Sequence, residues 1–305
     1  MKSINIGNSG LMASQLSLGC MRIGKLKVEE VETLIQTAVN LGINFFDHAD
    51  IYGAGKSESL FGEVLNRNPE LRSKVIIQTK CGICKGYYDN SKSHILESVN
   101  NSLHRLQTDY LDLLLIHRPD TLMVPEEINE AFNELKASGK VRYFGVSNMN
   151  SMQVEYLQHH LDERLIVNQL QFNVVHSGMI DAGINANMKN NHAIDYDGHI
   201  LEYSRLRNIT IQPWSVLQAS WEEGTYLNNP NYSLLNENLS YLSKKYNVEK
   251  AAIAVAWIMN HPANMQPIVG TTDVERLEKL SLAANVNLTR QEWYQLYLSS
   301  GHKLP

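Results

Sequence analysis

The chain has 305 residues, of which 43% are hydrophobic and 19% are charged, and its formal net charge is −5. This balance is typical of a globular protein with a large core. Because the sequence holds no run of basic residues, neither nucleic acid nor an anionic membrane surface is an expected partner. The amino terminus lacks the apolar core of a signal peptide, and no apolar run is long enough to span a bilayer, so we expect a soluble, cytoplasmic protein.

The chain alternates short apolar runs with amphipathic helical stretches. After a small hairpin around residues 7–10, strands are predicted at residues 15–20, 43–47, 75–80, 111–117, 141–147, 165–171, 209–214 and 267–269. Helices are predicted at residues 28–41, 57–66, 93–106, 125–138, 151–160, 199–206, 234–246, 250–260 and 273–284. A last helix begins at the Thr289 to Glu292 capping box. Residues 174–198 and 218–232 are expected to be irregular insertions.

Eight strands that each precede a helix indicate a single-domain (β/α)8 barrel over residues 1–305. It would carry an amino-terminal β-hairpin and extra helices before strand eight and at the carboxyl terminus. A doubly wound sheet is the rival fold. That fold normally brings a glycine-rich turn after the first strand, and residues 19–24 do not fit this fingerprint well.

Four polar residues lie at or just beyond successive strand ends: Asp47, Tyr52, Lys80 and His117. In a barrel the carboxyl ends of the strands form the active site, so these side chains are expected to meet there. A tyrosine phenol is a weak acid at neutral pH, and an adjacent Lys80 ammonium, kept charged by Asp47, is expected to lower its pKa. His117 can donate a hydrogen bond to a carbonyl oxygen. Together they predict a proton donor beside a hydride acceptor.

Five sequence blocks give these residues a family context. They are residues 46–53 (Phe-Asp-His-Ala-Asp-Ile-Tyr-Gly), Thr79-Lys80, residues 115–120 (Leu-Ile-His-Arg-Pro-Asp), residues 145–148 (Gly-Val-Ser-Asn) and Asn168-Gln169. In their order and spacing, the chain resembles the aldo-keto reductases over nearly its whole length. The resemblance implies an NADP(H)-dependent oxidoreductase that reduces a small aldehyde or ketone. Tyr52 would be the general acid, Lys80 and Asp47 would tune it, and His117 would position the carbonyl.

The resemblance also implies which residues bind the cofactor. These are Ser147, Asn148 and Gln169 for the carboxamide, Trp214 for stacking on the nicotinamide, Ser215, Val216, Leu217 and Gln218 for the pyrophosphate, and Gly270, Thr271, Thr272 and Arg276 for the adenosine 2′-phosphate, together with Gly19 and Met21 beside the first strand. Arg276 favours NADPH, because guanidinium pairs well with phosphate. Many members have lysine in place of Gly270 and asparagine in place of Leu280, so NADH is not excluded.

Two other functions stay open from the sequence. One is a cofactor-binding sensor or docking barrel with little turnover. The other is a metal-dependent hydrolase or lyase that uses His117, His48 and Asp47, although no complete metal-ligand set is expected. His176, Trp221 and Tyr226 are candidate substrate-pocket residues from the long insertions. The protein is expected to be a monomer or a weak homo-oligomer, and its physiological substrate and direction are not predicted.

The three cysteines, Cys20, Cys81 and Cys84, form an odd set, which favours reduced thiols in the absence of an export signal. Cys81 and Cys84 have the spacing of redox or metal pairs. They follow a strand rather than opening a helix, and no second pair accompanies them, so their role is left open.

Overall fold

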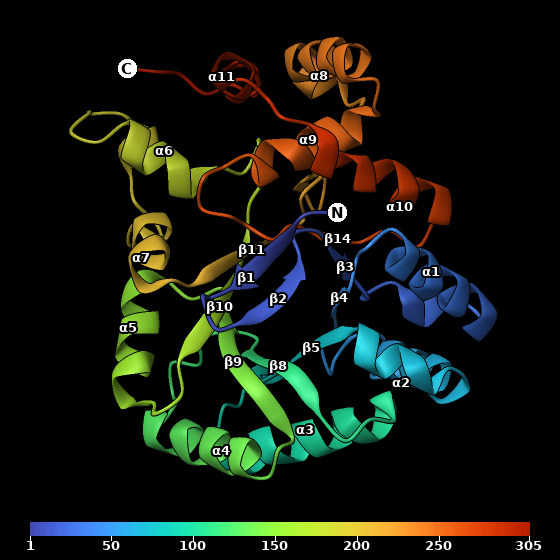
Figure 1. Cartoon of the computed structure of the whole chain (residues 1–305). Coiled ribbons are helices and arrows are strands. Elements are labelled where there is room, and N and C mark those ends of the chain that lie inside the picture. The colour runs from blue at the N-terminus through green and yellow to red at the C-terminus, as the bar shows by residue number, and fades with distance from the viewer.

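Eight parallel strands form one sheet that curls into a barrel (Figure 1). In the computed structural model, which describes residues 1–305, they are β3 (Ser17–Gly19), β4 (Phe45–Asp47), β5 (Ile76–Cys81), β8 (Leu111–Ile116), β9 (Val141–Ser147), β10 (Leu165–Gln171), β11 (Thr210–Trp214) and β14 (Ile268–Val269). The strands pair in chain order from β3 to β11, and β14 returns to pair with β3. Across the seam between β11 and β14, the Gln266 amide donates to the Ile211 carbonyl at 3.0 Å. The predicted (β/α)8 barrel is confirmed.

Helices cover the outside of this barrel (Figure 1). They are α1 (Val28–Asn40), α2 (Lys56–Arg67), α3 (Lys92–Leu106), α4 (Pro125–Ala137), α5 (Ser151–His160), α6 (Gly178–Ile184), α7 (Ile200–Arg207), α8 (Ser233–Tyr246), α9 (Lys250–Met259), α10 (Val274–Ser281) and α11 (Arg290–Ser299). Side chains of Ser91, Asn150 and Thr289 accept hydrogen bonds from first-turn amides and so fix the starts of α3, α5 and α11. The extra helices predicted before the last strand and at the carboxyl terminus are α8, α9 and α11. None of the helices has both the length and the apolarity that crossing a bilayer requires.

A hairpin closes the amino-terminal end of the barrel. Its strands β1 (Ser3–Ile6) and β2 (Leu11–Ser14) pair antiparallel, and their buried side chains pack against apolar residues inside the barrel. That cluster consists of Ile6, Ala13, Phe45, Ile76, Leu113, Leu115, Ile166 and Val167. Gly7 is required at the turn, because its φ is +55° and an added Cβ would lie 2.4 Å from the Cβ of Ile166. With this end plugged, a ligand has access only from the opposite end.

The first two barrel strands are shorter than predicted, and side chains explain the difference. The Ser14 amide donates to the Asn44 side chain at 2.7 Å, and the Asn44 amide donates to the Ser14 hydroxyl at 3.1 Å. Gln15 donates through its side chain to the Met259 carbonyl at 3.0 Å. These bonds satisfy polar groups near the strand starts without ladder pairing, so β3 begins at Ser17 and β4 at Phe45.

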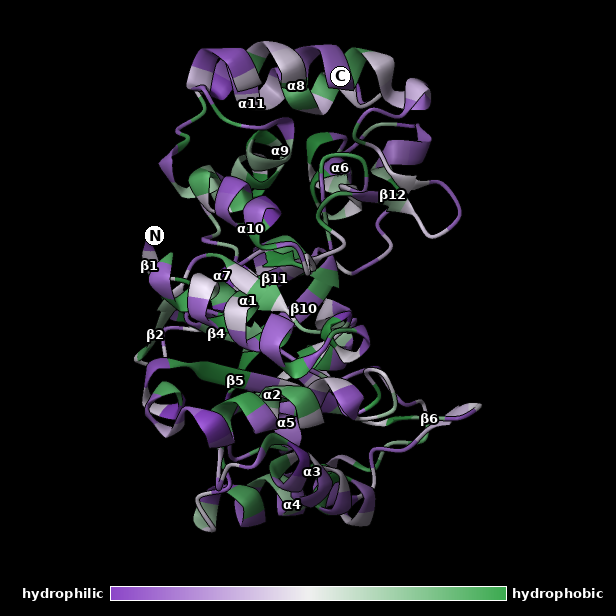
Figure 2. Ribbon diagram, turned by 90° about the vertical axis from the view of Figure 1, so that its right-hand side faces the viewer, coloured by the Kyte–Doolittle hydropathy of each residue, from purple (hydrophilic) through white to green (hydrophobic).

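Several short elements lie in the connections, and the sequence analysis did not predict them. They are the hairpins β6 (Ile83–Cys84) with β7 (Tyr87–Tyr88) and β12 (Gln218–Ser220) with β13 (Gly224–Thr225), helix α6, and the 3-10 turns at Ile23–Lys25, Pro69–Lys74, Asn191–Ala193, Pro230–Tyr232 and Leu282–Asn285. Gly86 and Gly224 have φ values of +90° and +74°, which allows the tight hairpin turns. Figure 2 shows β6 and β12 projecting at the end of the barrel opposite the amino-terminal hairpin.

Candidate active site

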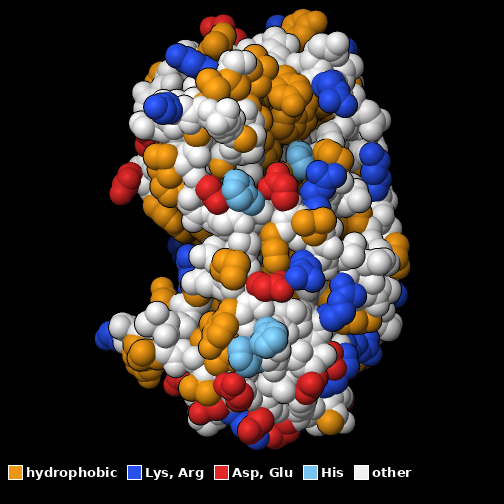
Figure 3. Space-filling model, turned by 90° about the vertical axis from the view of Figure 1, so that its left-hand side faces the viewer, with side chains coloured by type: hydrophobic (Ala, Val, Ile, Leu, Met, Phe, Trp, Pro, Cys, Tyr) orange, Lys and Arg blue, Asp and Glu red, His pale blue; other side chains and the backbone are white.

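A cavity of about 1070 Å³ opens at the carboxyl ends of the barrel strands. Its walls come from the ends of β3, β4 and β8 to β11, from the segment after β14, and from residues 214–228. The same end of the molecule is indented at the left edge of Figure 3. Asp47, Tyr52 and His117 line the cavity, and the buried Lys80 lies directly beneath them. The four residues predicted from successive strand ends are therefore brought together.

The ammonium of Lys80 is the centre of the cavity floor. Its Nζ lies 2.8 and 2.9 Å from the two carboxylate oxygens of Asp47, 2.7 Å from the His48 carbonyl and 3.1 Å from the Tyr52 hydroxyl. An ammonium has three donors and no acceptor, so all three are used by these partners. In the contact with Tyr52 the phenolic oxygen is therefore the acceptor. The Tyr52 hydrogen has no protein acceptor and is free to point into the cavity.

The protonation states of this pair follow from burial and charge. Burial raises the pKa of Tyr52, Lys80 lowers it and Asp47 raises it, with the result that the pKa lies above its ordinary value of 10.0. Lys80 lowers the pKa of Tyr52, as predicted, but the loss of hydration on burial outweighs this attraction, so the net shift is upward. Burial by itself would lower the pKa of Lys80, but Asp47 and then Tyr52 raise it above 10.5. At neutral pH the floor holds a protonated phenol beside a charged amine.

His117 lies at the end of β8 with its ring edge-on to Tyr52, the ring centroids being 6.1 Å apart. Burial, followed by the charges of Lys80 and Arg118, lowers the pKa of His117 to about 2, so the imidazole is neutral. Its Nδ1 is buried without a hydrogen-bond partner, while the ring lines the cavity. We assign the proton to Nε2, since a buried N–H without an acceptor is the less favourable arrangement. His117 then presents a neutral N–H donor to the cavity.

A layer of four buried glutamines supports Asp47 from below, and the sequence analysis missed all but one of them. Gln78 and Gln169 donate to Asp47 Oδ1 at 2.5 and 2.9 Å, and both also donate to Gln212 Oε1 at 2.9 and 3.2 Å. Gln212 in turn donates to Gln266 at 2.8 Å. Gln266 donates to the Ser14 carbonyl at 2.7 Å, so only Gln78 and Gln169 donate to the carboxylate directly, and Gln212 fixes both of them through its carbonyl oxygen. The sequence did carry a signal for two of them. Gln78 lies two residues before Lys80 on β5 and Gln212 two residues before Trp214 on β11, so each shares a strand face with a predicted site residue.

The residues predicted to hold a nicotinamide carboxamide form one connected group on the cavity wall. Trp214 Nε1 donates to Asn148 Oδ1 at 3.1 Å, Asn148 Nδ2 donates to the Ser147 hydroxyl at 2.7 Å, and Ser147 donates to the Gln169 carbonyl at 3.0 Å. All four side chains line the cavity. Asn148 has a φ of +58°, a left-handed conformation that asparagine tolerates better than most residues.

The far end of the cavity is open and is lined by charged side chains of both signs, among which Arg276 is unpaired. Gly19, Met21, Gly270, Thr271, Arg276 and residues 215–218 line it, whereas Thr272 does not. The Arg276 guanidinium forms no ion pair or hydrogen bond within the protein, and a Cβ at Gly270 would meet nothing within 4 Å. An unpaired guanidinium beside open backbone suits a phosphate. These residues therefore fit the phosphate end of a nicotinamide dinucleotide, with the Trp214 wall at the other end.

Asn173 is a further residue that the sequence analysis missed. It is completely buried, and its side-chain amide donates to the carbonyls of Ser215 and Gln218 at 2.8 and 2.9 Å. These bonds fix the ends of the loop after β11 along the cavity. Nothing in the sequence marked Asn173 apart from the other asparagines near it.

Of the three predicted substrate-pocket residues, one lines the cavity and two do not. Trp221 lines the cavity and is 70% exposed. Tyr226 is completely buried, and its hydroxyl donates to the Val216 carbonyl at 2.8 Å, so this prediction is not supported by its position. His176 does not line the cavity either. Each of these two residues lies in one of the predicted insertions, residues 174–198 and 218–232. The sequence does not show which residues of an insertion face the cavity, because packing decides this.

The residues of the metal hypothesis do not form a common site at the cavity. The His48 ring packs edge-on against Phe61, with the centroids 4.7 Å apart, and does not line the cavity. Asp47, His48 and His117 do not bring their ligand atoms within reach of one another.

Cys81 and Cys84 are free cysteines, and Cys81 is buried, which raises the pKa of its thiol.

Comparisons with known proteins agree with this geometry. The sequence model of the aldo/keto reductase family matches residues 15–297. The chain is 34% identical to the oxidoreductase YcsN of Bacillus subtilis, over 97% of each chain. It is 33% identical to a 6-dehydroglucose reductase of Agrobacterium fabrum, over 94% of each. The thermostable aldo-keto reductase Tm1743, solved with the inhibitor epalrestat, matches 98% of this chain and 100% of its own, with a TM-score of 0.80 and 25% identity. The chain belongs to the aldo/keto reductase family.

Proposed function

We propose that this protein reduces an aldehyde or a ketone to an alcohol with hydride from NADPH, and that Tyr52 delivers the proton. The observation that carries the proposal is the hydrogen-bond arrangement of Lys80. Its three donors are taken up by Asp47, the His48 carbonyl and the Tyr52 oxygen, which leaves the Tyr52 hydrogen facing the cavity.

In the proposed mechanism, each residue of the floor has a distinct task. His117 donates its Nε2–H to the carbonyl oxygen and holds it near the Tyr52 hydroxyl. When bound, NADPH supplies the hydride. As negative charge develops on the substrate oxygen, Tyr52 transfers its proton there and becomes a phenolate. The Lys80 ammonium at 3.1 Å stabilises that phenolate, and Asp47 keeps Lys80 charged and in place.

The cofactor preference is proposed from the cavity wall and from Arg276 at the far end. Ser147, Asn148 and Gln169 would hold the carboxamide, and Trp214 would stack on the nicotinamide ring. Arg276, which has no partner of its own, would pair with the 2′-phosphate that distinguishes NADPH from NADH. A small carbonyl compound is the proposed substrate. Because two relatives are named 6-dehydroglucose reductases, oxidised sugars belong in any substrate panel.

The direct experiment is titration of intrinsic tryptophan fluorescence with NADPH and with NADH, followed by a panel of aldehydes, dicarbonyls and oxidised sugars. We expect saturable quenching through Trp214, tighter binding of NADPH, and carbonyl-dependent loss of NADPH absorbance. Binding without turnover on any carbonyl would favour a sensor or docking barrel. Turnover that a chelator abolishes would favour metal-dependent chemistry and contradict the proposal.

A further inference from the structure

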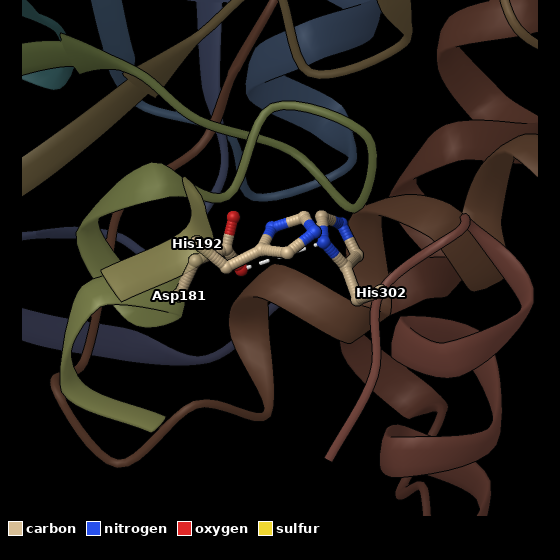
Figure 4. A group of neighbouring side chains, drawn as sticks. All are labelled: Asp181, His192 and His302. Atoms are coloured by element: carbon tan, nitrogen blue, oxygen red, sulfur yellow. Dashed lines mark ion pairs between the residues drawn. The ribbon is translucent and has the colours of Figure 1, made fainter. Parts of the chain in front are cut away.

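A second cluster of titratable side chains lies away from the cavity, where the carboxyl-terminal tail crosses the insertion after β10. Asp181 comes from α6, His192 from the 3-10 turn Asn191–Ala193, and His302 from the tail that follows α11. Figure 4 shows the carboxylate and the two imidazole rings converging from these three segments. Their ligand atoms all lie within 4.8 Å of one another, and none of the three residues lines the cavity.

The hydrogen bonds around His302 leave one ring nitrogen without a partner. Its Nε2 lies 2.9 Å from the Ser177 hydroxyl and 3.1 Å from the Val174 carbonyl. Because the carbonyl can only accept and the Ser177 hydroxyl donates to Asp181 at 3.0 Å, we assign a proton to Nε2. The other nitrogen, Nδ1, is buried without a hydrogen-bond partner, and the His302 side chain is only 9% exposed. Nδ1 faces Asp181 Oδ1 at 3.5 Å. A neutral His302 would thus turn a lone pair toward a carboxylate, and this arrangement is relieved by either a proton or a metal ion between the two atoms.

The surroundings of the cluster are those of metal ligands rather than of a simple ion pair. A ligating histidine commonly donates its second nitrogen to a backbone carbonyl, as His302 does to Val174. The Asp181 carboxylate is held by the Tyr297 hydroxyl at 2.8 Å and the Ser177 hydroxyl at 3.0 Å. The Tyr297 ring also stacks on His302, with centroids 4.4 Å apart and planes 11° apart. The carboxylate and the His302 ring are therefore already oriented.

The distances suit a small divalent ion. Zn–N and Zn–O bonds of about 2.0–2.2 Å in a tetrahedron place ligand atoms about 3.3–3.6 Å apart, which is the Asp181 to His302 separation. His192 is exposed on a short turn, so its ring can complete the set by a small side-chain movement. Two imidazoles and a carboxylate select Zn²⁺-like transition metals over Ca²⁺ and Mg²⁺, which prefer oxygen ligands.

We propose that Asp181, His192 and His302 form a binding site for a divalent transition metal ion of the Zn²⁺ class, with water in the remaining position. The ion would join the carboxyl-terminal tail to the insertion that carries α6. Figure 3 shows the face over α5, α6 and α7, where histidine side chains lie beside acidic ones. This site is separate from the cavity and does not depend on the proposed reduction.

The test is calorimetric titration of the chelator-treated full chain with ZnCl₂, with amide hydrogen exchange of residues 299–304 as a second readout. We expect one ion per chain and slower exchange in the tail when Zn²⁺ is present. We expect Zn²⁺ binding to weaken about tenfold or more in each of three variants: His192→Ala, Asp181→Asn and His302→Ala. Loss of a residue that only supports a ligand already costs about 10–100-fold in metal affinity, and loss of a ligand should cost no less. His192→Ala is the most informative variant, because His192 is exposed and lies outside the tail. Its substitution should change exchange in residues 299–304 only if a bound ion joins the two segments.

The matched control is His160→Ala. His160 also pairs with a second imidazole, His159, at a centroid distance of 5.1 Å, and with the Glu126 carboxylate at 3.8 Å, but it has no unpartnered buried nitrogen. Zn²⁺ binding that survives in His160→Ala and is lost in His192→Ala supports the site. Absence of one-to-one binding, equal binding by His192→Ala and wild type, or tail exchange that Zn²⁺ leaves unchanged would each overturn it.

Discussion

The two ends of the cavity differ in how fully their polar groups are engaged. At the floor, Lys80 uses every donor on protein partners, and Asp47 receives both that ammonium and two glutamine amides. At the far end, the Arg276 guanidinium has no partner within the protein. The floor is therefore organised before any ligand arrives, whereas the far end gains its interactions from the ligand. The difference teaches that chemistry and affinity can be perturbed separately.

Substitution of Lys80 tests the floor with the largest expected effect. Lys80→Met should lower kcat about 10²–10⁴-fold, because the phenolate that forms on proton transfer loses its neighbouring charge. The Kd for NADPH should change little. Steady-state rates and fluorescence titration measure the two quantities. The control is Lys92→Met, a surface lysine paired with Glu130 at 3.1 Å, and a comparable loss of rate in that variant would point to a general effect.

Substitution of Arg276 tests the far end. Arg276→Ala should weaken NADPH binding about 10–100-fold, the loss expected for charge-assisted hydrogen bonds, and should leave NADH binding unchanged. At saturating NADPH, kcat should remain near that of the wild type. Lys279 on the same helix already pairs with Glu275 at 2.8 Å, so Lys279→Ala should have the smaller effect. Equal weakening of both dinucleotides would show that Arg276 does not contact the 2′-phosphate.

The glutamine layer beneath the floor is tested by Gln212→Leu. This change leaves the buried amides of Gln78 and Gln169 with one acceptor fewer and should reduce the free energy of unfolding by about 1–3 kcal/mol. It should also lower kcat, because Asp47 is less well oriented. Urea denaturation measures the first effect. Gln36→Leu on the surface of α1 serves as the control, and equal stability of both variants would contradict a role for the layer.

Substitution of Asp50 should have the smallest effect, a change in the free energy of unfolding that depends on pH. Burial, and then Glu58, raises the pKa of Asp50 to about 6 from 3.8, and its Oδ1 is buried without a partner. The unfolded carboxyl ionises first as pH rises, so this group destabilises the fold progressively between about pH 4 and 6 and fully above that. A shift of about two pKa units corresponds to at most about 3 kcal/mol, and Asp50 is partly exposed, so Asp50→Asn should add about 1–2 kcal/mol to the free energy of unfolding at pH 7.5 and nothing near pH 3.5. A gain that is independent of pH would contradict this origin.

The sequence predicted the elements that local patterns control. Alternation along the strands placed Asp47, Lys80 and His117 at strand ends, and Thr289 marked a helix start correctly. It could not predict the partners of Gln212, because parity gives a face but not the residue across the barrel. It predicted the effect of Lys80 on the pKa of Tyr52 but not the larger effect of burial, which depends on the assembled fold. It also placed Tyr226 in the pocket, although that residue is buried with its hydroxyl bonded to the Val216 carbonyl.

Tyr52 holds the proton that is transferred to the substrate, while Lys80 and Asp47 beneath it have all their hydrogen-bond partners within the protein. The most direct measurement compares wild type and Tyr52→Phe in two assays on the same preparation: carbonyl-dependent oxidation of NADPH and NADPH binding by tryptophan fluorescence. We predict that the phenylalanine variant binds NADPH nearly as tightly as the wild type and has lost turnover. A variant that retains a tenth or more of the wild-type rate would contradict the account.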